Sequence, residues 1–268
     1  MRILVIGDPH GNRKIFDIPL DNIDCVLIPG DLGSSNLARK YYFEYDIKQS
    51  KPWGETLPKE KVEEAFLEIV STIEKILKHF DKAKIPTYWI HGNVEDTIDD
   101  RIEKYKLNVT KLSDMKFDNV KLINYKKSKF EDITFIGIPY FKDADWIMRF
   151  TPENEVSLLR AQKKQELARQ HLKELGKADI VMMHDLPYGI MDKVRNPSAT
   201  QSWQGKHAGS KILLDYIKKT EPKIVLCGHM HENAGMEMLG KTKIINVGSE
   251  GKYLIIDIVG KEITITKH

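Results

Sequence analysis

Seven polar side chains that could bind metal ions each follow an apolar run in this sequence. The first run ends at Gly7, and Asp8 and His10 come directly after it. A continuous apolar run is typical of a strand buried on both faces, and four further runs end in a similar way. Because ligands of open α/β sheets bind outside the carboxyl ends of the strands, we expect these side chains to lie together. They are Asp8, His10, Asp31, Asn93, His184, His229 and His231.

The mixture of donor atoms indicates which metals would bind. Four imidazoles, two carboxylates and one amide oxygen suit Zn, Mn, Fe, Ni or Co better than Ca or Mg alone. Two ions about 3.5–4 Å apart need roughly this many ligands and at least one bridging carboxylate. Such a pair stabilises both the attacking and the leaving oxygen of an in-line displacement. The sequence therefore predicts two divalent transition metal ions, with manganese favoured.

Strands and helices must alternate along the chain to bring these residues together. We expect buried strands within 2–11, 24–31, 86–93, 178–184 and 223–231, and glycine directly precedes the first polar residue in four of these five. Glycine permits a sharp turn and a close approach of neighbouring groups. Apolar spacing predicts helices over 59–82, about 98–105, 153–175 and about 210–219. We also expect a hairpin within 120–140 and three antiparallel strands over 236–268.

Composition limits the class of protein. The chain has 268 residues and a formal net charge of +3, so it offers no strong electrostatic case for a nucleic-acid or membrane partner. Cys25 and Cys227 lie in apolar runs, where buried thiols are expected rather than a disulfide. No charged and apolar leader opens the chain, and no apolar run approaches the length of a membrane span. We therefore expect a cytoplasmic protein with no membrane association.

We expect one domain over residues 1–268, because no linker divides the chain. Residues 32–58 lack clear periodicity but carry four tyrosine and phenylalanine residues and one tryptophan, which is too aromatic for a disordered linker. This stretch is interpreted as an insertion beside the site that serves as a packed cover. The oligomeric state does not follow from the sequence.

The order Asp-x-His, Gly-Asp, Gly-Asn, His and Gly-His-x-His resembles the calcineurin-like metallophosphoesterase superfamily, of the bacterial and archaeal phosphoesterase type. The resemblance extends from Asp8 to about Ser249. It implies an α/β fold, a four-layer α/β/β/α sandwich of two mixed β-sheets flanked by helices. It also implies that a hydroxide on the dinuclear metal site attacks phosphorus in line. One metal would be held by Asp8, His10, Asp31 and His231 and the other by Asp31, Asn93, His184 and His229, with Asp31 bridging.

The chain departs from the family pattern after the Gly-Asn motif. Family members commonly have a histidine there that contacts phosphate and assists the leaving group, whereas this chain has Val94. General-acid help is worth typically ~10²–10⁴-fold, so activity on alkyl phosphates should be weak unless another residue substitutes. His207, in a glycine-flanked loop before a predicted helix, is the candidate replacement, and Asp31 and His207 are the predicted catalytic residues.

The favoured function is therefore a metal-dependent phosphodiesterase acting on a small phosphate ester or a nucleotide-derived diester. A phosphomonoesterase with His207 as the acid is one alternative. A metal-binding interaction scaffold with vestigial catalysis is another, although a scaffold has no chemical need for seven ligands. A nuclease is possible but not favoured, because the charge is near neutral.

Overall fold

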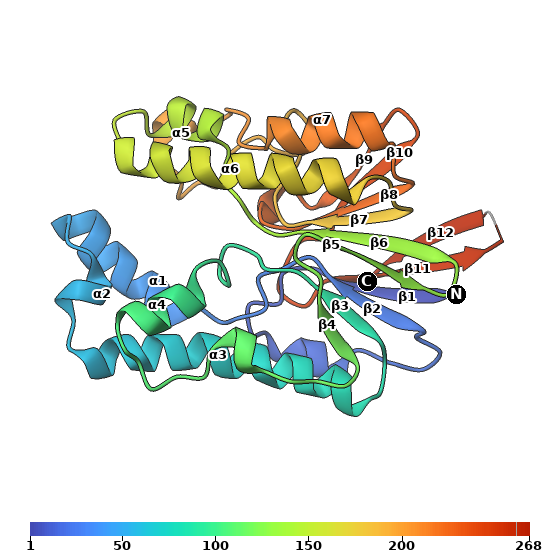
Figure 1. The fold of residues 1–268 in the computed structure, drawn as a ribbon, viewed down its shortest axis with the longest axis horizontal. Coiled ribbons are helices and arrows are strands. Elements are labelled where there is room, and N and C mark those ends of the chain that lie inside the picture. The colour runs from blue at the N-terminus through green and yellow to red at the C-terminus, as the bar shows by residue number, and fades with distance from the viewer. Residues whose placement is uncertain (261) are drawn as a thin grey trace.

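Two β-sheets lie face to face in the middle of the computed structural model, which describes residues 1–260 and 262–268 (Figure 1). The first sheet has the strand order β12-β11-β1-β2-β3-β4, and the second has the order β5-β6-β7-β8-β10-β9. Both sheets are mixed, since each has both parallel and antiparallel strand pairs. The strands are β1 (Arg2–Ile6), β2 (Cys25–Ile28), β3 (Thr87–Trp89), β4 (Val120–Leu122), β5 (Lys126–Phe130), β6 (Ile133–Ile138), β7 (Ile180–Met183), β8 (Ile224–Cys227), β9 (Gly235–Leu239), β10 (Thr242–Asn246), β11 (Tyr253–Val259) and β12 (Glu262–Lys267).

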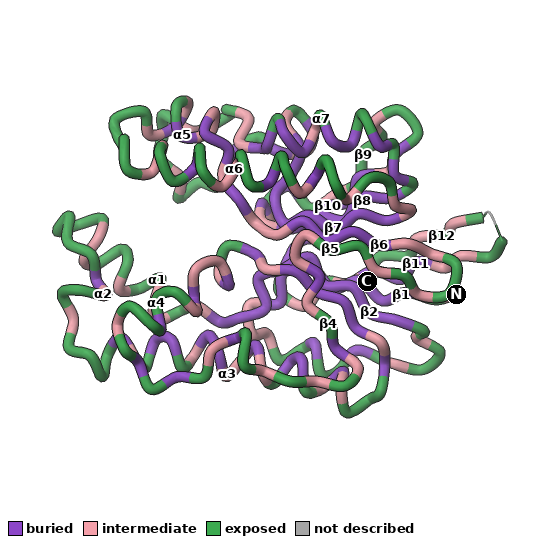
Figure 2. The backbone as a smooth tube through the Cα atoms, viewed as in Figure 1, coloured by how far each residue is buried: buried purple, intermediate pink, exposed green. Residues whose placement is uncertain are grey.

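Helices cover the outer face of each sheet. The first sheet packs against α3 (Lys59–Lys82) and α4 (Ile98–Lys104), and the second against α6 (Glu155–Leu175) and α7 (Lys211–Thr220). Buried residues follow the sheets and the inner sides of the helices (Figure 2). The predicted four-layer α/β/β/α sandwich is confirmed. Three further helices, α1 (Asn36–Tyr41), α2 (Trp53–Thr56) and α5 (Ala144–Phe150), were not predicted.

The two-residue repeat of a strand explains why β1 is apolar throughout. Ile3 and Val5 face the second sheet, while Leu4 and Ile6 face the helical layer. Each set joins a separate hydrophobic cluster. Cys25 and Cys227 are buried free thiols, as expected.

The predicted helix over 59–82 agrees with α3 at both ends. Its apolar residues recur every three or four positions and are buried against the first sheet. Residues 36–56 of the predicted cover form α1, a π-helical segment (Tyr42–Ile47) and α2. Trp53 is buried there, with its ring centroid 5.9 Å from that of Phe66 on α3.

The prediction of three antiparallel strands over 236–268 was wrong. Four strands lie there, in two hairpins that belong to different sheets: β9 and β10 extend the second, and β11 and β12 extend the first. β10 also pairs in parallel with β8. The β9 strand was overlooked because it is a mostly exposed edge strand with little alternation between apolar and polar residues.

Candidate metal centre

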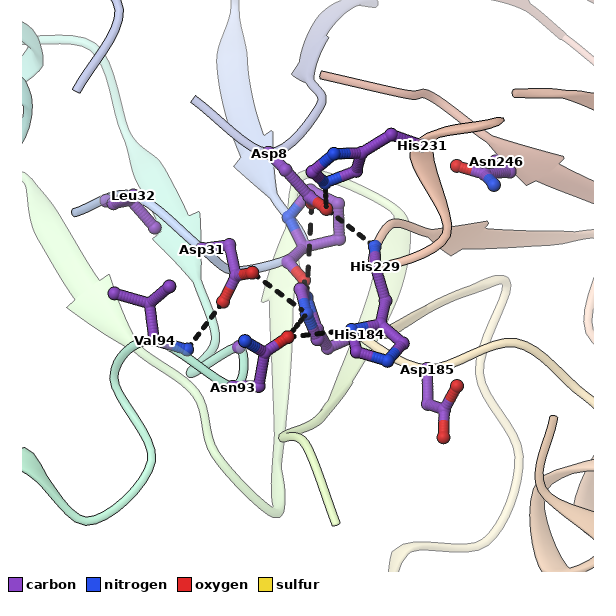
Figure 3. A network of polar contacts seen from close by, with 12 residues as sticks. Asp8, Asp31, Leu32, Asn93, Val94, His184, Asp185, His229, His231 and Asn246 are labelled. Atoms are coloured by element: carbon purple, nitrogen blue, oxygen red, sulfur yellow. Dashed lines mark hydrogen bonds and ion pairs between the residues drawn. The ribbon is translucent and has the colours of Figure 1, made fainter. Parts of the chain in front are cut away.

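Five parallel strand ends meet between the two sheets. Asp8, Asp31 and Asn93 follow β1, β2 and β3 of the first sheet, whereas His184, His229 and His231 follow β7 and β8 of the second. Figure 3 shows these six side chains turned toward one another. His10 joins the cluster through contacts with His231 and Asp31. The structure thus brings together all seven residues that the sequence singled out.

One half of the cluster is built from Asp8, His10 and His231. Each offers a ligand atom, and these atoms lie within 4.8 Å of one another. His231 Nε2 is 2.9 Å from Asp8 Oδ2, and His10 Nε2 is 3.3 Å from His231 Nε2. Two imidazole nitrogens that face each other beside a carboxylate form an arrangement that a shared cation would stabilise.

The other half is built around the amide oxygen of Asn93. Asn93 Oδ1 lies 3.1 Å from His184 Nε2 and 2.7 Å from His229 Nδ1. His184 is fully buried, and its Nδ1 donates a hydrogen bond to the carbonyl oxygen of Pro29 at 2.9 Å. A carbonyl can only accept, so this bond leaves Nε2 of a neutral His184 as the free ligand nitrogen.

Asp31 lies between the two halves. Its Oδ2 is 3.6 Å from His10 Nε2 and 3.5 Å from His184 Nε2, while its Oδ1 accepts the backbone N–H of Val94 at 2.8 Å. A single carboxylate oxygen therefore faces an imidazole from each half. This is the position that a bridging ligand would need.

Without metal, the carboxylates and imidazoles of the cluster stabilise each other's charged forms. Burial opposes ionisation of Asp31, but His184 and His10 outweigh it and hold the pKa of Asp31 well below its ordinary value. Burial likewise opposes protonation of His184, yet Asp31 and Asp8 raise the pKa of His184 to about 10. Burial, together with the neighbouring His184, lowers the pKa of His229 to about 3. A bound dication would displace the His184 proton, since a ligating imidazole must be neutral.

An unpartnered buried oxygen tests whether a metal fits here. Asp8 is fully buried, and its Oδ1 has no hydrogen-bond partner among the described residues. Its Oδ2 accepts the backbone N–H of His229 at 2.6 Å. A buried carboxylate oxygen without a donor is costly unless a cation faces it. The donor set and this free oxygen fit divalent metal ions.

The backbone at the strand ends is shaped to bring the ligands close. His10, Asp31 and His229 have φ of +45°, +50° and +68°, a left-handed conformation that costs non-glycine residues of order 1–3 kcal/mol each. A Cβ on Gly92 would overlap the Asp31 carboxylate, and one on Gly228 would overlap that of Asp8. The glycines before the polar residues therefore permit the close approach that the sequence suggested.

Comparison with protein families agrees with this geometry. A family model described as metallophosphoesterase, calcineurin superfamily, matches residues 11–268. The chain belongs to this superfamily. This match confirms the resemblance drawn from the strand-end motifs. Members of the superfamily are metal-dependent phosphoester hydrolases that typically bind divalent metals. The match begins directly after His10. The assignment of Asp8 and His10 as candidate metal ligands is therefore supported by the sequence motif and by the geometry.

One solved structure shares the fold of this chain. One crystal structure is 16% identical and aligns over 99% of this chain and 98% of that chain, with a TM-score of 0.64. The crystal structure of TT1561 of Thermus thermophilus is also 16% identical over 99% and 98% of the two chains, with a TM-score of 0.47. Comparison with curated proteins found no matching sequence. Across the described residues, no helix is long and apolar enough to cross a membrane.

Glu95 holds the backbone of the loops that carry Asp31 and Asn93 in this metallophosphoesterase. This buried carboxylate accepts the backbone N–H groups of Asp31, Leu32, Gly33 and Gly92, at distances of 2.8–3.2 Å. Burial, with the charge of Asp31, raises the pKa of Glu95 to about 7, and the bonds from Gly92 and Gly33 act in the opposite direction. Glu95 thus ties together the loops that follow β2 and β3.

Two residues discussed from the sequence lie around the cluster. Val94 follows Asn93, and its partly buried side chain packs against the core of the first sheet. His207 is partly buried, and its Nδ1 is 2.5 Å from Asp192 Oδ1. Within the described chain, no hydrogen bond or ion pair joins His207 to any of the seven candidate ligands. Whether His207 acts in catalysis stays a prediction.

Sequence reasoning missed Tyr140, Asp185 and Asp192. The Tyr140 ring lies against two candidate ligands, with centroids 5.3 Å from His229 and 5.8 Å from His184. Asp185 follows His184 directly in the chain (Figure 3), and burial raises its pKa to about 7. Tyr140 follows the end of β6, so the same strand-end pattern could have found it. Asp192 lies in a loop, where no periodic signal exists.

Proposed function

We propose that this metallophosphoesterase is a phosphodiesterase that acts on small or nucleotide-derived phosphodiesters. Asp8, His10, Asp31 and His231 would hold one divalent ion. Asp31, Asn93, His184 and His229 would hold the other, with Asp31 shared. Manganese is the favoured metal. The convergence of these seven side chains between the two sheets carries the proposal.

When bound, the two metal ions would supply a water-derived nucleophile at neutral pH and offset the negative charge that develops on the phosphoryl oxygens. The chain itself contributes orientation. Pro29 holds His184 with Nε2 turned toward Asn93, and Val94 N–H holds one oxygen of Asp31 so that the other faces the two imidazoles. Glu95 holds the backbone of both loops in place.

The preference for diesters rests on Val94. Val94, the residue after Asn93, is partly buried against the core and has no proton to give to a leaving oxygen. Unless another side chain supplies that proton, esters whose leaving groups need one would react slowly, and diesters with good leaving groups would suffer less.

A phosphomonoesterase is the second candidate, and the contact between His207 and Asp192 favours it, because this pair offers a proton donor that Val94 does not.

Hydrolysis of bis-p-nitrophenyl phosphate and of p-nitrophenyl phosphate by metal-stripped protein tests these alternatives, with Mn, Ni, Co, Zn or Mg added back in turn. Faster metal-dependent turnover of the diester is expected, and it would also identify the most effective metal. Preferential turnover of the monoester would support the second candidate. Stoichiometric metal binding without turnover of either ester would contradict both and point to a metal-binding scaffold.

A further inference from the structure

A second polar site lies at the turn His231–Asn233, which begins at a candidate metal ligand. We propose that His207 and Asp192 form a proton-donating pair, in which Asp192 positions His207 to protonate the leaving alcohol. We also propose that the cavity they line holds that alcohol, of the size and polarity of a nucleoside or sugar. This inference rests on the proposed phosphoesterase function and adds the residues that would serve its leaving group.

Asp192 is held rigidly. It is buried, and its Oδ2 accepts the backbone N–H groups of Gly189 at 3.0 Å and Gly209 at 2.9 Å. Its Oδ1 is left to face His207 Nδ1 at 2.5 Å. A carboxylate can only accept, so Nδ1 of His207 carries the proton of this bond and Nε2 is the free nitrogen.

His207 is held on its backbone as well. Arg149 on α5 donates hydrogen bonds to the carbonyl oxygens of His207 and Gly209. His207 also pairs with Lys193 in an isolated antiparallel bridge. About a third of its side chain is exposed, with a side-chain relative accessibility of 32%, so the ring can reach a ligand while it stays bonded to Asp192. Such an arrangement needs little reorganisation before proton transfer.

A cavity of about 420 Å³ opens beside this pair. Its volume falls in the range of small-ligand sites, roughly 300–1,000 Å³. Polar and charged groups dominate the wall, which favours a hydroxyl-rich ligand over an apolar one. The lining includes Asp192, His207, Lys193, Arg195, Glu232 and Glu237.

One short turn connects the cavity to the metal centre. The 3₁₀ turn His231–Asn233 begins at a candidate metal ligand and continues as Glu232 and Asn233 in the cavity wall. Asn233 Nδ2 donates to the carbonyl oxygen of Lys193 at 2.7 Å, and Glu232 accepts the backbone N–H of Asn196 at 3.2 Å. The turn therefore holds the loop that carries Asp192 next to the half of the centre that contains His231.

The chemical step balances without a further reactant. As hydroxide oxygen bonds to phosphorus and the P–O bond to the alcohol breaks, the Nε2–H bond of protonated His207 breaks and its proton passes to the departing oxygen. The alcohol leaves neutral, and the His207 cation becomes a neutral imidazole with Nδ1–H bonded to Asp192. Water restores the proton at Nε2.

Asp192→Asn and His207→Gln test the pair on metal-loaded protein. The substrates are bis-p-nitrophenyl phosphate, whose leaving group needs no acid, and thymidylyl-thymidine, whose leaving group is an alkyl alcohol. Both variants should lose ~10²–10⁴-fold on the dinucleotide and less than about 10-fold on the aryl ester. Asp215→Asn, an exposed change on α7, is the matched control and should alter neither rate.

¹⁵N NMR of the histidine rings provides a readout independent of turnover. In metal-free protein, neutral His207 should carry its proton on Nδ1, and Asp192→Asn should move it to Nε2, because an amide N–H then faces Nδ1. His207→Gln identifies the resonance. A wild-type Nε2–H form would overturn the proposed pair.

The outcomes separate this inference from the proposed function. If the wild type is active and the two variants lose equal activity on both esters, the inference alone is overturned. It is also overturned if the wild type hydrolyses the aryl ester but does not hydrolyse the dinucleotide. No metal-dependent turnover of any ester by the wild type would overturn the proposed function, and with it the catalytic role of the pair.

Discussion

At the scale of single residues, carboxylates in this protein differ by what surrounds them. Asp31 faces imidazoles of both halves of the cluster, and its pKa lies well below the ordinary value. Glu95 instead accepts backbone N–H groups from the loops that follow β2 and β3. One is suited to bind a cation and the other to hold the chain that carries it.

Replacing Glu95 by glutamine should weaken both folding and metal binding. One of the two oxygens would become an NH₂ group facing backbone donors, and each buried donor left unpaired costs about 1–3 kcal/mol. We expect the free energy of unfolding in urea to fall by about that amount, and metal affinity to fall ~10–100-fold, as for other residues that orient ligands. The exposed Glu60→Gln on α3 should change neither quantity. An unchanged Glu95→Gln protein would contradict this supporting role.

At the scale of elements, α3 stabilises the first sheet through one face only. Leu77 is fully buried among the core residues of that face, whereas Leu67 on the same helix is 54% exposed. The helix therefore offers the same residue type in two environments, and the difference between them measures what packing contributes.

Leu77→Ala should lower the free energy of unfolding by about 2–5 kcal/mol, because it removes buried methyl groups and leaves a cavity. Leu67→Ala should stay within about 0.5 kcal/mol, as is usual for surface changes. Urea unfolding of both variants would measure the difference. Similar losses in the two variants would mean that the outer face of α3 is covered in solution.

At the scale of the whole molecule, the candidate metal centre joins the two sheets. Asp8, Asp31 and Asn93 come from the first sheet and His184, His229 and His231 from the second. The sheets also share an apolar interface, which includes Val5, Phe135 and Leu226. At the strand ends the facing groups are polar and charged instead of apolar. Bound metal would cross-link the two sheets there.

Metal should therefore stabilise the whole fold. A ligand that binds only the folded state adds about 2.7 kcal/mol at 100 times its Kd. Thermal unfolding with added Mn²⁺ should shift upward, and removal of metal with a chelator should reverse the shift. Asp31→Ala should abolish most of the shift as well as activity, since both ions lose a ligand. A full Mn²⁺ shift with two bound metals in Asp31→Ala would refute the bridging assignment.

Local sequence patterns determined the parts of this protein that depend on near neighbours. The bounds of α3 follow from a 3.6-residue repeat, and the buried strands follow from apolar runs that end near glycine. The seven candidate ligands could be identified for the same reason. Parallel strands must bring their carboxyl ends to one edge, so residues such as Asp8 and Asp31 meet without further information.

Only the tertiary structure decided which distant groups meet in the loops and at the sheet edges. Asp192 and His207 lie 15 residues apart in an aperiodic loop, and Glu95 reaches backbone groups more than 60 residues away. The division of the last four strands between the two sheets is likewise a long-range choice of pairing partner. Hydrogen bonds of this kind leave no period in the sequence, because a loop residue is placed by the packing of the elements on either side of it.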